Sequence, residues 1–252
     1  MKYSILVLIF VSVVNLFSCK NEVASINIVR DRSFQPMEIG KFWEYRLDTI
    51  FYNDATYKKD TTICEIKEVV ADTFYDNSGY TNYRIERFKR KNASQPWAIH
   101  NVWYGRYFQD KFERIEDNQR VIKMILPLTN YQTWNGSAYI FRDTVYTVRN
   151  ISIEIYKDWG NFQVTDLNNT FTDAFTSILY PKTLEITQVK SENNIELRYS
   201  IERYAQGIGL VFKQMKILDT QCRGNLANCV GKTWEEKAEK GFIISWHLLR
   251  HN

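Results

Sequence analysis

The stretch 199–213 contains two strand-like runs joined through glycines, and it constrains the fold more than any other part of the chain. Its first run alternates Tyr199, Ile201 and Arg203 with Ser200, Glu202 and Tyr204, which is the period of two of a β-strand. Gly207 and Gly209 indicate a bend or bulge where a Cβ would obstruct the backbone. A dinucleotide-binding loop would need a third glycine at position 212, but Phe212 stands there. The stretch therefore predicts a structural hairpin.

Similar alternating runs, separated by turn residues, follow one another through most of the chain. The predicted strands are 42–50, 61–70, 81–89, 97–108, 111–115, 119–126, 208–218 and, at the end of the chain, 242–249. Hairpins that succeed one another in sequence favour an antiparallel sheet. Two short helices are also predicted, one over 172–179 before Pro181 and one over 233–240 behind a Thr233 cap.

Length and composition favour a single β-rich domain over 35–252. The chain has 252 residues, and its 16 Tyr and 15 Phe suit strands around a wide interior. The formal net charge of +4 is small and scattered along the chain. No basic stripe is present in the sequence, which argues against nucleic acid as a partner.

The first 18 residues have the pattern of an export signal. Lys2 is followed by an apolar run over 4–17, and Ser18 precedes Cys19. The run is too short for a comfortable membrane span. Leu-Phe-Ser-Cys19 resembles the bacterial lipoprotein signal, which implies a lipid on Cys19 and a partner membrane, with 19–34 as a polar tether. The prediction is a lipid-anchored cell-envelope protein at the outer membrane; an ordinary signal with an incidental cysteine is the alternative.

Three cysteines remain after Cys19. Cys222 and Cys229 flank a Gly-Asn turn at a spacing that a disulfide can close, and an exported chain permits that bond. Free thiols and a metal site are the alternatives; with three histidines in the chain, a metal site has few ligands to draw on. Cys64 lies within an apolar strand and is interpreted as a small buried side chain.

Two pairs of short motifs recur in the same order. The interval from Pro to Trp is seven residues in both 36–43 and 127–134, and Tyr-Arg-Ile-Glu-Arg-Phe at 83–88 is matched by Tyr-Ser-Ile-Glu-Arg-Tyr at 199–204. An insertion over 158–180 would lengthen the second half. The pattern suggests two degenerate repeats, with chance similarity in a Tyr-rich chain as the alternative.

The export signal, the segments 36–45 and 127–136, and Tyr-Ala-Gln-Gly-Ile-Gly-Leu-Val at 204–211 together resemble small lipoproteins of Bacteroidetes bacteria. The element at 204–211 is also similar to one in TapB-like and half-barrel envelope lipoproteins. The resemblance implies a mainly β fold: a strongly curved antiparallel sheet or half-barrel with a concave apolar face. It also implies O-glycosylation at Asp-Thr-apolar sites, here Thr49, Thr61 and Thr144; ordinary strand and loop threonines are the alternative.

Motifs for catalysis or cofactors are weak in this sequence. A phosphate-binding loop before Lys232 fails because Leu226 stands where its first glycine is required. His247 and His251 could share a strand face, but no acidic neighbour in the sequence completes a metal site. The sequence predicts no cofactor, no metal and no catalytic residue.

One enzymatic alternative rests on Glu86 and Glu202, the matching carboxylates of the two Tyr-x-Ile-Glu-Arg motifs. If the two strands faced each other, the carboxylates could act as a pair in glycoside hydrolysis by an envelope hydrolase. Each lies beside an arginine, Arg87 or Arg203, so structural ion pairs are the simpler interpretation.

The ring-rich segment 97–108 supplies the predicted binding residues. They are Trp97, Trp103, Tyr104, Tyr107 and Phe108. These rings either line a hollow in the sheet or form its core. The sequence predicts a non-enzymatic binding or structural protein that holds an apolar ligand or a partner protein of the envelope.

Overall fold

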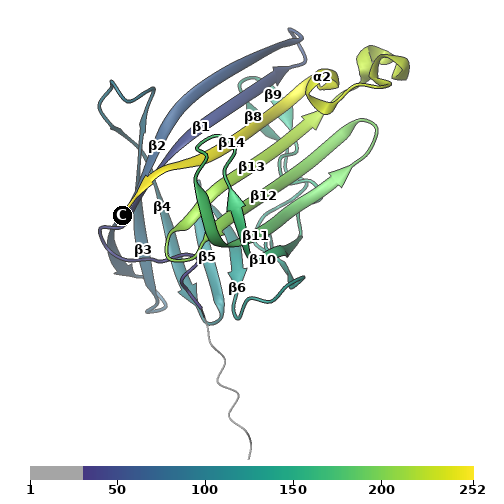
Figure 1. Ribbon diagram of the computed structural model, residues 1–252. Coiled ribbons are helices and arrows are strands. Elements are labelled where there is room, and N and C mark those ends of the chain that lie inside the picture. Colours follow the sequence, from purple (N-terminus) through teal and green to yellow (C-terminus); the bar gives the residue numbers. More distant parts are fainter. Residues whose placement is uncertain (1–30) are drawn as a thin grey trace, which may run out of the picture.

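The computed structural model describes residues 31–252, so the predicted signal peptide and Cys19 lie outside the described residues. Its main element is one antiparallel sheet of 12 strands, curved until it nearly closes on itself (Figure 1). The strands in chain order are β1 (Phe42–Asn53), β2 (Lys58–Tyr75), β3 (Thr81–Arg90), β4 (Ala98–Phe108), β5 (Lys111–Glu116), β6 (Gln119–Ile125), β7 (Thr133–Asn135), β8 (Tyr146–Val148), β9 (Ile151–Ile153), β10 (Asn161–Thr172), β11 (Leu179–Glu192), β12 (Glu196–Ala205), β13 (Gly209–Asp219) and β14 (Lys240–His251). The predicted fold class, a mainly β protein with a strongly curved antiparallel sheet, is confirmed.

The order of strands in the 12-stranded sheet is β6-β5-β4-β3-β2-β1-β14-β13-β12-β11-β10-β7. Strands β8 and β9 form a separate hairpin. Sequence neighbours pair as hairpins almost throughout, and the C-terminal strand β14 fills the place between β1 and β13. The predicted final strand is therefore confirmed, and it joins the two halves of the chain.

The glycine-linked stretch 199–213 forms the hairpin β12–β13, as its alternation predicts. Gly209 has a φ of 111°, a region that side chains rarely adopt. A Cβ there would also lie 3.0 Å from Nε1 of Trp43, which donates a hydrogen bond to the carbonyl of Ile208 at 2.5 Å. The glycine thus lets β1 pack its indole directly against the turn.

The two edge strands, β6 and β7, approach each other where the sheet nearly closes. Ile122 on β6 donates its backbone N–H to the carbonyl of Gly136 at 2.9 Å, and its own carbonyl accepts from Nε1 of Trp134 at 2.8 Å. Gly136 is required at this junction, because a Cβ would lie 2.2 Å from the ring of Phe162. The approach of β6 to β7 also places β6 opposite β12 across the interior, where Lys123 contacts Glu202.

The core fills the concave side of the sheet. Its main cluster is rich in aromatic rings from both halves, including Trp43, Tyr45, Phe112 and Phe162. The small hairpin β8–β9 adds a second cluster at one end, where Ile151 packs with residues of β1, β13 and β14. Phe34, within the predicted tether, is 2% exposed and belongs to the main cluster, so the chain is already part of the domain there.

The predicted helix over 172–179 is wrong: this segment is the turn between β10 and β11. Asp173 explains the difference, because its carboxylate accepts from the backbone N–H groups of Phe175 and Thr176 at 2.7 and 3.2 Å. An aspartate that binds the backbone two and three residues ahead stabilises a turn in place of a helix.

The predicted helix over 233–240 is shorter than expected. Helix α2 spans Trp234–Lys237 and begins with a capping box between Thr233 and Glu236. Trp234 packs with Tyr52 and neighbours on the convex face of the sheet. Among residues 31–252, no helix combines the length and apolar character needed to cross a bilayer.

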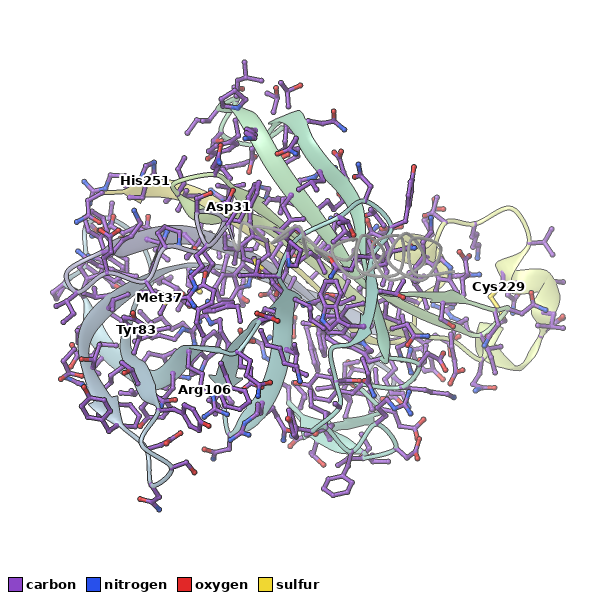
Figure 2. All side chains as sticks on the ribbon, turned by 90° about the horizontal axis from the view of Figure 1, so that it is seen from below. Asp31, Met37, Tyr83, Arg106, Cys229 and His251 are labelled. Atoms are coloured by element: carbon purple, nitrogen blue, oxygen red, sulfur yellow. A yellow bond between two sulfur atoms is a disulfide. The ribbon has the colours of Figure 1, made fainter. Side chains whose placement is uncertain are left out.

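Cys222 and Cys229 are joined in the structure by a disulfide, with their Cα atoms 5.5 Å apart. The bond closes the loop that precedes α2 (Figure 1). Figure 2 shows Cys229 well away from Asp31, where the described chain begins. Cys64 is a free, half-buried thiol, and burial raises its pKa.

Candidate functional site

A cavity of about 230 Å³ lies in the concave face of the sheet, between its two halves. Strands β3 to β6, β11, β13 and β14 supply most of its wall, and the segment after β9 supplies two further rings. The lining residues are Arg87, Trp103, Glu116, Asp117, Val121, Lys123, Tyr156, Trp159, Gln188, Lys213, Met215, Ile244 and Trp246. Asp117 is exposed, so one end of the cavity reaches solvent.

Charged side chains concentrate behind and within this wall. We call them the inner charge cluster: Glu68, Arg87, Arg114, Glu116, Lys123, Glu202 and Lys213. Buried charges are costly unless they are paired and hydrogen-bonded. In this cluster every charge has a partner of opposite sign.

Glu202 is the centre of one half of the inner charge cluster. Its carboxylate contacts Nζ of Lys123 at 2.8 Å and Nζ of Lys213 at 3.0 Å, and it accepts from the hydroxyl of Tyr204 at 2.6 Å. Although burial alone raises the pKa of Glu202, the two ammonium groups together bring that pKa far below its usual value. The carboxylate is therefore fixed in its ionised form.

Glu116 extends this half toward the open end of the cavity. It lies 3.1 Å from Nζ of Lys123 and 3.4 Å from Nε of Arg114. Burial raises its pKa, but Lys123, Lys213 and Arg114 outweigh that effect and bring the pKa to about 2. Both acids that neighbour Lys123 are thus ionised at neutral pH.

Glu68 is the centre of the other half, on the β2–β5 side. It accepts from Arg87 Nε at 3.0 Å and from Arg114 Nη2 at 3.1 Å. The guanidinium carbon of Arg87 lies 3.4 Å from the ring centroid of Trp103 and 5.4 Å from that of Trp246. Burial lowers the pKa of Arg87, and contact with Glu68 opposes that shift. Stacked rings and a buried carboxylate together hold this cation in place.

Backbone alternation explains how these residues reach one interior. On β12 the side chains of Ser200, Glu202 and Tyr204 point inward, while on β13 Lys213 and Met215 do so. Closure of the sheet then brings Lys123 of β6 to Glu202, 79 residues away in sequence. Sequence reasoning missed Lys123 and Lys213 as site residues. For Lys123 the signal available was a lysine in the middle of a strand between two apolar residues, Ile122 and Met124, where charged residues are rare unless paired.

The structure does not bring Glu86 and Glu202 together, so the paired-carboxylate arrangement does not exist in the described chain. Glu86 points to the convex face, where it binds Arg84 at 2.6 Å and is 29% exposed. Its neighbour Arg87 points inward. Arg203 likewise points outward, to Glu185 and Asp166. Neither carboxylate pairs with the arginine next to it in sequence.

Of the five predicted binding rings, Trp103 is the one that lines the cavity. Tyr104, next to it, points to the opposite face and packs edge-on against Phe74. Trp97 stacks under Arg90, Phe108 packs on Tyr80, and the hydroxyl of Tyr107 donates to the carbonyl of Gln35 at 2.7 Å. The five rings therefore do not form one surface. Tyr104 and Phe108 face away from Trp103 because neighbours on a strand face opposite sides, whereas Tyr107 is on the same side as Trp103 but packs against Phe112.

His247 has an acidic partner that the sequence did not indicate. Its Nδ1 lies 2.9 and 3.0 Å from the carboxylate oxygens of the fully buried Asp173, 74 residues away, and its ring contacts Phe175. Within residues 31–252, no group of three or more His, Cys, Asp and Glu side chains is arranged to hold a metal ion.

The predicted glycosylation sites have different environments. Thr61 and Thr144 are exposed, and Thr49 is half-buried. Their modification remains a prediction.

Two larger hollows, of about 520 and 510 Å³, flank the disulfide loop. Both are lined mainly by exposed or half-buried residues of the loops at that end. Neither is lined by a buried polar side chain that lacks a hydrogen-bond partner within the described chain. Two further hollows, of about 410 and 400 Å³, have on their lining residues Ser33, Gln35 and Glu44 buried oxygens without a hydrogen-bond partner in the described chain. The central cavity differs from all four because its lining residues Trp159 and Gln188 carry buried N–H groups without such a partner beside the inner charge cluster, and we take it as the candidate site.

No family model and no curated protein matches this chain. Two solved structures are similar to it. One is a Bacteroides fragilis protein described as exported, with a YmcC-like fold (10% identity, TM-score 0.42), and the other is a Parabacteroides distasonis protein described as a lipoprotein (12% identity, TM-score 0.32). Each alignment covers 87% of this chain and 98% of the other. Likenesses with TM-scores below 0.5 do not decide what this chain does.

Proposed function

We propose that this protein is a non-enzymatic binding protein of the cell envelope, anchored through a lipid on Cys19, which holds a small polar ligand in the cavity of its curved sheet. The observation that carries the proposal is the cavity itself. Three cations, two acids and three tryptophans line a hollow of about 230 Å³ at the centre of the molecule, where a simple core would be apolar.

The proposal replaces the apolar ligand expected from the sequence with a polar one. The concave face was expected to be apolar, but its centre carries the inner charge cluster, with Glu202 and Lys123 almost completely buried. An acyl chain placed against these groups would form no hydrogen bonds with them. A polar ligand would contact the charges and rings already held in fixed positions.

Native mass spectrometry of the protein extracted from its own envelope in mild detergent tests the binding proposal. We expect an added mass that is absent from Met215→Trp, which fills the cavity, and retained in Lys216→Trp, the outward-facing control on the same strand. Equilibrium dialysis against a small-molecule extract of the envelope would detect a ligand lost during purification. If both experiments show no molecule that distinguishes the variants, the proposal is wrong.

The anchor is tested separately with Cys19→Ser. We expect the wild-type protein to stay with the membrane fraction and the variant to be released, because stable anchoring requires acyl chains. Recovery of the variant in the membrane fraction at the wild-type level would contradict lipidation as the anchor and leave the binding proposal unaffected.

A further inference from the structure

We propose that the ligand carries an oxyanion, a carboxylate or phosphate group, which binds Lys213 and the indole N–H of Trp159 in the central cavity. This inference rests on the proposed binding function and names the chemical class of its ligand. It is carried by the hydrogen-bonding groups of the wall, which present donors without matching acceptors.

Two lining residues carry buried N–H groups that have no hydrogen-bond partner among residues 31–252. They are Nε1 of Trp159 and Nε2 of Gln188, and the two side chains are 3% and 1% exposed. An indole nitrogen can only donate. Most buried polar groups in folded proteins are hydrogen-bonded, so unpaired donors on residues of a cavity wall point to an acceptor that the described chain does not supply. Both nitrogens are buried, so a ligand oxygen reaches them after a small shift of the side chains.

Lys213 adds further donors. Its ammonium group contacts Glu202 at 3.0 Å, which is the one acceptor it contacts among residues 31–252, and it lies 5.8 Å from the ring centroid of Trp246. An ammonium group has three N–H donors. Two of them thus remain for a ligand beside the rings.

The two carboxylates of the wall already have donor partners. Glu116 contacts Lys123 and Arg114. Asp117 accepts from Asn101 at 2.7 Å and from Nε1 of Trp103 at 3.1 Å. A ligand that brought donors would compete with these contacts, whereas a ligand that brings oxygen acceptors would offer partners to Lys213 and to the unpaired N–H groups of Trp159 and Gln188. Bonds between an ammonium donor and an oxyanion are also stronger than neutral ones.

The volume of the cavity and its apolar lining residues limit what the rest of the ligand can be. At about 30 Å³ per water molecule, a cavity of about 230 Å³ holds roughly seven or eight waters. A small organic acid or a phosphorylated small molecule fits this space, and a lipid chain exceeds it. Met215, Ile244 and Trp246 offer apolar contacts for a short carbon skeleton or a sugar ring.

The test compares D-glucuronate with D-glucose, which differ by one carboxylate, and adds inorganic phosphate. Binding to the full mature protein is followed by tryptophan fluorescence and calorimetry. We expect glucuronate or phosphate to bind at least roughly tenfold more tightly than glucose, as one charge-assisted contact would give. Trp159→Phe keeps the ring and removes the donor, and Lys213→Met removes the ammonium group; both should reduce this preference severalfold. Lys216→Met, on the outer face, should leave it unchanged.

The results separate the proposed binding function from the inference that the ligand carries an oxyanion. Glucose binding as tightly as both anions would overturn the oxyanion inference and leave the binding function in place. A neutral ligand identified by native mass spectrometry would do the same. If neither anion binds, the inference is wrong; if dialysis also finds no ligand, the proposed function falls with it. Trp159→Phe keeps the test valid if Lys213→Met does not fold, because the indole N–H is not part of any ion pair.

Discussion

Strands β3 and β12 have nearly the same sequence, Tyr-Arg-Ile-Glu-Arg-Phe at 83–88 and Tyr-Ser-Ile-Glu-Arg-Tyr at 199–204. Even so, the motif positions whose side chains point into the interior on β3 point outward on β12. On β3 the buried charge is Arg87, and Glu86 lies outside. On β12 the buried charge is Glu202, and Arg203 lies outside. A shift of one residue exchanges the faces of a strand, so the same motif contributes a cation in one place and an anion in the other.

Partners on the neighbouring strands, together with Lys123 from across the interior, explain why both arrangements are stable. The inward Arg87 meets Glu68 and the ring of Trp103. The inward Glu202 meets two lysines from β6 and β13. Local sequence therefore does not decide which charge is buried; the side chains supplied by the neighbouring and facing strands do. The two motifs are similar in sequence, but their side chains have opposite orientations.

The largest effect is expected from alanine at the two matched glutamates. Glu202→Ala leaves Lys123 and Lys213 buried beside an empty position, and breaking such a pair costs about 3–5 kcal/mol. Glu86→Ala removes a half-exposed contact with Arg84 and should cost about 1 kcal/mol or less. Urea unfolding of both variants measures the difference. Equal losses would mean that the two carboxylates have equivalent surroundings, contrary to the opposite orientations described above.

The matched arginines should show the reverse pattern across the same two strands. Arg87→Ala removes a buried partner of Glu68 and the stacking on Trp103, although Arg114 remains on that carboxylate, and we expect a loss of about 2–4 kcal/mol. Arg203→Ala affects a partly exposed pair and should cost about 1 kcal/mol or less. The same denaturation experiment applies. A larger loss for Arg203→Ala than for Arg87→Ala would reverse the assignment of inner and outer faces.

A smaller effect is expected from Tyr204→Phe, which gives β12 the residue that β3 has at the corresponding position, Phe88. The variant removes the hydroxyl that donates to Glu202 at 2.6 Å and keeps the ring. Loss of one hydrogen bond to a buried charge should cost roughly 1.5–3 kcal/mol. The control Tyr199→Phe lies on the outer side of the same strand. If both changes were neutral, the hydroxyl of Tyr204 would not be part of the inner charge cluster.

The strands were predictable from sequence, whereas the site was not, and the reasons differ. The hairpin 199–213 follows from side-chain alternation and two glycines, which are local properties. The cavity depends on closure of β6 onto β7 and on contacts such as Lys123 with Glu202, whose partners are far apart in the chain. The segment 172–179 was predicted wrongly for a different reason. Asp173 contacts both the local backbone and His247, and the helix-like sequence pattern indicated neither contact.

Carboxyl-detected NMR of ¹³C-labelled glutamate, followed from pH 7 to pH 2, tests the account most directly. Burial raises the folded-state pKa of Glu202 and of Glu116, but Lys123 and Lys213 outweigh it: they hold the pKa of Glu202 far below its usual value and bring that of Glu116 to about 2. Because these pKa values are depressed on folding, the stability they contribute is present above about pH 4.5 and is lost as pH falls through the folded-state values. We predict a resonance, absent from Glu202→Gln, that stays at its ionised shift down to at least about pH 3. If that resonance titrates near the ordinary glutamate value while the protein is folded, Glu202 does not lie in a buried charge cluster and the proposed site is wrong.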